Sequence, residues 1–125
     1  YSVQGTNPSG TPYSGTVEIT AKGATFLVHW ILPTADGNDE SYGIGILSHG
    51  LLVVAAGQPT PVGVLLSSVV AYTVKPGAPL EGTWATPSAR GVYKEVLTKL
   101  PAGHPPASPQ TKPRATPDPK KERRL

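Results

Sequence analysis

The feature that most constrains this chain is an alternation of apolar and polar residues with a period of two. The segment 13–20 shows it clearly, with Tyr13, Val17 and Ile19 in one phase and polar side chains between them. Glycine, proline, asparagine and aspartate interrupt the alternation at short intervals. This pattern is typical of antiparallel strands with one buried face, whereas a 3.6-residue apolar stripe would indicate a helix. The sequence therefore predicts an all-β fold.

The breaks divide the chain into about eight strands, which is the spacing expected of a barrel or a sandwich. Parallel pairing would need crossovers of about a dozen residues, and the connections here are too short for that. We therefore expect an antiparallel up-and-down meander that closes into a small barrel, because closure removes unpaired edges. A β-sandwich is the alternative. Polar and turn-forming residues predict loops over 33–40 and 57–61. The alternating segments predict strands over 1–5, 13–20, 24–32, 41–47, 51–56, 64–74, 80–85 and 91–98.

The composition changes near Leu100, which divides the chain into a β-barrel-like domain (1–99) and a tail (100–125). Residues 101–125 contain seven of the 15 prolines and carry a net charge of +4, whereas residues 1–100 carry −1. We expect the tail to be disordered and to act as a spacer or a tether to anionic surfaces. The folded domain is close to neutral and has no steering field for nucleic acid, so no nucleic-acid partner is expected there.

Metal, cofactor and disulfide signatures are missing from the sequence. There is no cysteine, and the three histidines lack the short spacing of a zinc site. The acidic segment 36–40 lacks the glycine and glutamate positions of an EF-hand loop. The longest apolar runs, 51–56 and 62–66, are far shorter than the roughly 20 residues of a membrane-spanning helix. We predict no metal, no cofactor and no enzymatic activity.

One enzymatic alternative remains open at this level. Strand carboxylates at Glu18, Glu81 and Glu95 are available for a two-carboxylate hydrolase. No G-x-S-x-G nucleophile motif is present. A hydrolase is therefore the second alternative to a binding function.

Aromatic residues on the predicted strands are the best candidates for a site. Strand phase places Phe26 with Trp30, and Trp84 with Leu80. Convergence inside a barrel would produce an apolar cavity, whereas the alternative is an ordinary core. The predicted ligand-binding residues are Phe26, Trp30, Tyr42, Tyr72 and Trp84.

The segment 1–17 contains the pattern G-x-N-P-x-G-x-x-Y-x-G, from Gly5 to Gly15. It resembles the opening of small, largely uncharacterised bacterial secreted or periplasmic proteins, and segments 43–45, 80–84 and 91–97 are similar to their later parts. The resemblance covers residues 1 to 98 and implies a short β-rich domain with an extracytoplasmic location. It implies no particular chemistry. The chain contains no methionine, which we take to indicate a processed form or a fragment.

Together these observations predict a non-enzymatic extracytoplasmic domain that binds a small apolar ligand or a surface partner. The first alternative is a structural or interaction module whose basic tail tethers it to an anionic surface.

Overall fold

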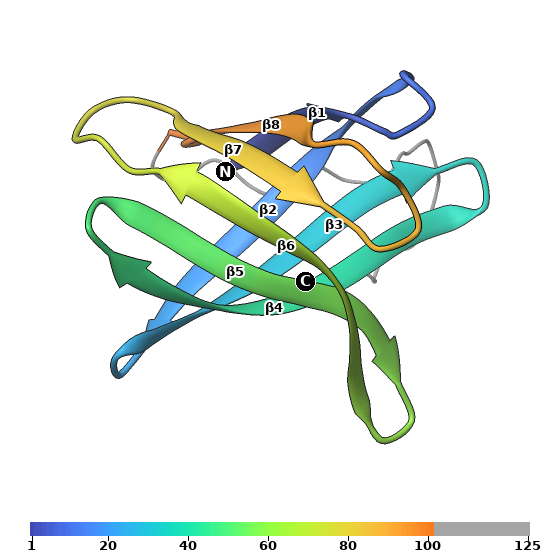
Figure 1. Ribbon diagram of the computed structural model, residues 1–125, viewed down its shortest axis with the longest axis horizontal. Helices are drawn as coiled ribbons and strands as arrows, with labels where there is room; N and C mark the ends of the chain where they lie inside the picture. Colours follow the sequence, from blue (N-terminus) through green and yellow to red (C-terminus); the bar gives the residue numbers. More distant parts are fainter. Residues whose placement is uncertain (102–125) are drawn as a thin grey trace.

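The computed structural model describes residues 1–101 and shows a closed antiparallel barrel (Figure 1). Neighbouring strands in the sequence pair with each other throughout, and β1 also pairs with β8, which closes the sheet. The predicted all-β meander barrel is therefore confirmed. The predicted tail lies outside the described residues, apart from its first two positions. The strands are β1 (Ser2–Thr6), β2 (Pro12–Lys22), β3 (Thr25–Thr34), β4 (Gly37–Ser48), β5 (Leu51–Thr60), β6 (Gly63–Thr73), β7 (Leu80–Ala85) and β8 (Tyr93–Thr98).

The two predicted polar loops are wrong, because both segments are largely strand. The β3–β4 hairpin closes with a two-residue turn between Thr34 and Gly37, and the β5–β6 hairpin closes in the same way between Thr60 and Gly63. In each turn the threonine hydroxyl donates to the glycine carbonyl, at 2.9 and 3.1 Å. The glycines have φ of 126° and 143°, a region that L side chains rarely adopt. A repeated T-x-x-G pattern, rather than polarity, marks these turns.

Apolar side chains fill most of the barrel interior. Residues from all eight strands except β4 contribute to one buried cluster. The largest of its fully buried members is Tyr72, which has no exposed surface. The lumen is thus a packed core over most of its length, as expected for an eight-stranded barrel. The cluster consists of Val3, Val17, Val28, Trp30, Leu52, Val54, Ala56, Val70, Tyr72, Leu80 and Leu97.

Strand β4 places Gly43 and Gly45 toward the interior, and these glycines leave room for side chains of other strands. A Cβ atom added at Gly43 would lie 2.7 Å from Val54 Cγ1 and 3.2 Å from Trp30 Cζ3. Tyr42 and Ile44, the neighbours of Gly43 in the sequence, consequently lie on the outer face. Glycine at alternate positions leaves room for neighbouring side chains.

The outer face of the barrel carries an exposed apolar row across β3 to β6. Leu27 pairs with Ile44, and Ala55 lies between Ile44 and Val69 in the register. Leu27, Ile44 and Val69 are 41%, 50% and 49% exposed. No described segment covers this row. Within residues 1–101, no helix is long and apolar enough to cross a membrane.

Candidate ligand site at one end of the barrel

A glutamate lies inside the barrel, where the core would otherwise be apolar. Glu95 shares the inward phase of β8 with Leu97 and is only 5% exposed. Its Oε1 accepts a hydrogen bond from the Tyr13 hydroxyl at 2.6 Å. Its Oε2 accepts hydrogen bonds from Trp30 Nε1, at 3.0 Å, and from the Tyr72 hydroxyl. A buried carboxylate is tolerated only with such partners.

Two glycines bring the tyrosines to this carboxylate. Glu95 pairs with Gly5 on β1 and with Gly82 on β7. Tyr13 is the partner of Gly5 on the next strand, and Tyr72 is the partner of Gly82 on the other side. The inward row across β2, β1, β8, β7 and β6 therefore reads Tyr, Gly, Glu, Gly, Tyr. Each tyrosine lies over a position without a side chain, and its hydroxyl reaches the carboxylate from either side.

The electrostatics of this row keep both tyrosines protonated. Burial, followed by the adjacent charge of Glu95, raises the pKa of Tyr72 well above its ordinary value. The same two causes, in the same order, raise the pKa of Tyr13. Both hydroxyls are therefore permanent donors to the carboxylate at any physiological pH.

The glycine requirement is testable at Gly82. An added Cβ would lie 2.6 Å from two ring carbons of Tyr72, whose side chain is fully buried. We expect Gly82→Ala to lower the free energy of unfolding by about 1–3 kcal/mol, the usual cost of overpacking a core. Urea unfolding followed by tryptophan fluorescence measures this. Glu81→Ala, one position away and exposed on the outer face, is the control, with an expected change within about 0.5 kcal/mol. Equal stabilities for the two variants would contradict this packing.

A pocket of about 130 Å³ that is open to solvent, called the cavity below, lies next to Glu95 at the barrel end formed by turns 7–11, 35–36, 61–62 and 86–92. Tyr13, Trp30 and Trp84 supply aromatic walls. A wider depression of about 890 Å³ shares four lining residues with the cavity, including Tyr13 and Glu95, so the two are adjacent. The remaining residues of the cavity lining are Asn7, Leu32, Ser41, Ala56, Ser68 and Val70.

The five predicted ligand-binding residues do not form one group. Trp30 and Trp84 line the cavity. Tyr72 contacts Glu95 but does not line the cavity. Phe26 packs against the apolar core. Tyr42 lies on the outer face, because the glycines beside it take the inward phase of β4, and placing it with the interior aromatics was wrong.

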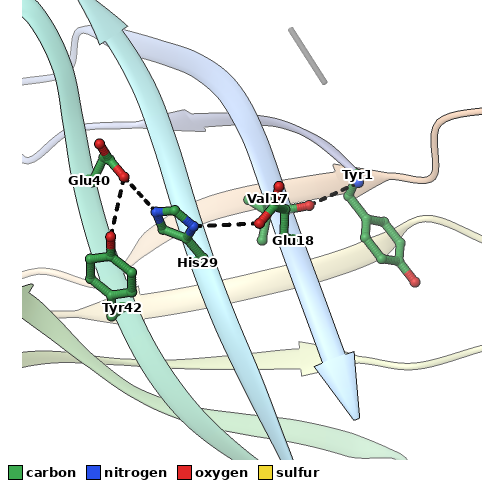
Figure 2. A network of polar contacts seen from close by, with 6 residues as sticks. All are labelled: Tyr1, Val17, Glu18, His29, Glu40 and Tyr42. Carbon is green, nitrogen blue, oxygen red and sulfur yellow. Dashed lines mark hydrogen bonds and ion pairs between the residues drawn. The ribbon is translucent and has the colours of Figure 1, made fainter. Parts of the chain in front are cut away.

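Tyr42 belongs to a second polar cluster, on the outside of the barrel (Figure 2). Its ring stacks on His29 with centroids 4.3 Å apart. His29 Nε2 lies 2.7 Å from Glu40 Oε1, and Nδ1 lies 3.5 Å from Glu18 Oε1. The Tyr42 hydroxyl donates to the same Glu40 oxygen at 3.3 Å. An adjoining groove of about 430 Å³ is largely apolar, with Leu27, Ile44, Val64 and Leu66 in its lining.

The strand carboxylates considered for hydrolysis lie on opposite sides of the sheet. Glu95 faces the lumen, Glu18 contacts His29 outside, and Glu81 neighbours the inward-facing Gly82 and so points outward. These three do not form a facing pair. Among residues 1–101, no three His, Cys, Asp or Glu side chains are arranged to bind a metal ion.

The geometry defines a closed barrel with a small polar-aromatic cavity at one end. No family model, curated protein or solved structure matches the chain.

Proposed function

We propose that this protein is a non-enzymatic binding domain that holds a small ligand in the cavity beside Glu95. The observation that carries the proposal is that Trp30 and Trp84, the two tryptophans of the chain, both line this cavity. Ligand sites are typically concave, with aromatic walls and a few oriented polar groups. The carboxylate of Glu95 and the aromatic walls meet that description. The extracytoplasmic location implied by the resemblance remains part of the proposal.

The ligand is small and partly polar, rather than purely apolar as the sequence suggested. An apolar cavity of about 150 Å³ accommodates benzene, so a cavity of about 130 Å³ fits a molecule of benzene size or smaller. Ser41, Ser68, Asn7 and Glu95 add polar atoms to the lining. Larger ligands would extend into the adjacent depression, which shares Tyr13 and Glu95 with the cavity.

A surface partner is the second candidate. The observation that favours it is the exposed apolar row of Leu27, Ile44 and Val69, together with the groove beside Tyr42. Exposed apolar patches of this kind often mark interaction sites. The tethering function of the tail lies outside the described residues and stays a prediction.

Native mass spectrometry of the full chain, purified gently from its own host, tests the proposal. We expect an added discrete mass from a bound molecule, and we expect Trp84→Ala to weaken the binding of that molecule about fivefold, because a lost aromatic contact costs on the order of 1 kcal/mol. Tyr42→Ala removes an aromatic ring from the outer groove and is expected to keep the bound mass. The reverse result, loss in Tyr42→Ala alone, would support the surface partner. If the unsubstituted chain shows only the mass of the protein, with no bound species, the result would count against a tightly bound ligand in the cavity.

A further inference from the structure

We propose that the cavity binds a compact organic cation, with the carboxylate of Glu95 as its counter-charge. This inference rests on the proposed function and names the chemical class of the ligand. Three features of the site carry it: an uncompensated charge, aromatic walls and a free acceptor position.

The charge of Glu95 is hydrogen-bonded but not neutralised. Its three donors, Tyr13, Trp30 and Tyr72, are all neutral. Among residues 1–101, the ion-pair contacts both involve His29 on the outer face. The nearest basic residue in the sequence, Lys94, donates instead to Thr83 at 3.4 Å, at an exposed position. A buried carboxylate without a cationic partner favours any ligand that brings a positive charge.

The walls around the carboxylate suit a cation. Tyr13 and Trp84 meet edge to face with ring centroids 6.4 Å apart. Tyr93, which lies outside the cavity lining, packs against Trp84 with centroids 5.1 Å apart and supports that wall. Aromatic faces carry a negative quadrupole potential that attracts ammonium groups within about 6 Å. An anion placed in the same space would lie beside the negative charge of Glu95.

The carboxylate also keeps room for one more donor. A carboxylate offers about four acceptor positions, and Glu95 uses three of them. The open position is on Oε1, which accepts from Tyr13 alone. An ammonium N–H directed at Oε1 would complete the set. The volume of about 130 Å³ limits the part of the ligand that lies beside Glu95 to a compact group.

Tert-butylammonium and tert-butanol have nearly equal shape and therefore separate charge from size. Trimethylacetate, a somewhat larger probe, supplies the opposite charge. Each is titrated into the full chain labelled with ¹⁵N, and the readout is the pair of indole N–H signals of Trp30 and Trp84. We expect tert-butylammonium to bind at least tenfold more tightly than tert-butanol, and trimethylacetate to bind most weakly. Glu95→Gln is expected to remove the preference for the cation, and Glu81→Gln on the outer face is expected to retain it.

The outcomes distinguish this inference from the proposed function. Equal or tighter binding of tert-butanol or trimethylacetate in the unsubstituted chain would overturn the proposed preference for a cation. The proposal of a small-molecule site would remain. Full retention of the preference in Glu95→Gln would also overturn this inference. No shift of either indole signal by any probe at concentrations on the order of 100 mM would overturn both. The comparison in the unsubstituted chain decides the question even where a variant does not fold.

Discussion

Glu95→Ala is expected to lower the free energy of unfolding by about 3–5 kcal/mol, a large part of the total stability of a domain this size. The substitution leaves three buried donors, on Tyr13, Trp30 and Tyr72, without their acceptor. Each unsatisfied buried donor costs about 1–3 kcal/mol. Chemical unfolding followed by far-ultraviolet circular dichroism measures the effect without relying on the tryptophans that the substitution disturbs.

Two further variants assign the cause. Glu95→Gln keeps the shape and one acceptor oxygen, so we expect it to cost clearly less than the alanine variant. Glu81→Ala removes a carboxylate of the same type from the exposed face of the adjacent strand, with an expected change within about 0.5 kcal/mol. A Glu95→Ala protein within about 1 kcal/mol of the unsubstituted one would show that the three donors find other acceptors, and that this network does not hold the barrel together.

The importance of Glu95 illustrates what the sequence could reveal about the site. Strand phase puts Glu95 on the same face as Leu97, but Val92 and Val96 in the other phase are apolar too, so the alternation does not decide which face is buried. The partners of Glu95 are not readable from the sequence either, because Tyr13 and Tyr72 are 82 and 23 residues away along the chain. Only the register across Gly5 and Gly82 brings them together. A one-residue shift in any of these pairings would turn a whole set of side chains to the other face.

The fold can be predicted from the sequence more fully than the site can, for a physical reason. The alternation of apolar and polar residues and the short connections determine an antiparallel meander, whichever particular apolar or polar side chains are present. Polar composition is a poor guide to where a strand ends, because turn chemistry decides that. The polar segment 33–40 reads as a loop, yet its ends continue the ladder to the turn between Thr34 and Gly37. Residue type alone suggests an interior place for Tyr42, whereas the inward position of Gly43, where an added Cβ would lie 2.7 Å from Val54 Cγ1, places Tyr42 outside.

Tyr72→Phe is expected to change how stability depends on pH above about 10. The folded state holds the Tyr72 proton because burial and then the Glu95 charge raise its pKa, while a tyrosine in the unfolded chain titrates near its ordinary value of about 10. The stabilisation that comes from keeping this proton is fully present below that value. Above it the unfolded chain releases the proton and the folded one does not, so stability falls by about 1.4 kcal/mol per pH unit from this residue alone.

The phenylalanine variant lacks that titration but also lacks the hydrogen bond to Glu95. At pH 7 we expect it to be less stable by about 1.5–3 kcal/mol, the usual value for a bond to a charged group. Between about pH 10 and 11.5 the difference from the unsubstituted protein should narrow by about 1.4 kcal/mol per unit, as measured by urea unfolding at fixed ionic strength. Tyr93→Phe leaves the Tyr72–Glu95 bond in place and should retain the alkaline slope of the unsubstituted protein. If the curves for Tyr72→Phe and the unsubstituted protein run parallel through this range, Tyr72 does not donate a tightly held proton to a buried charge. The lumen would then lack the anionic character on which the proposed cation site depends.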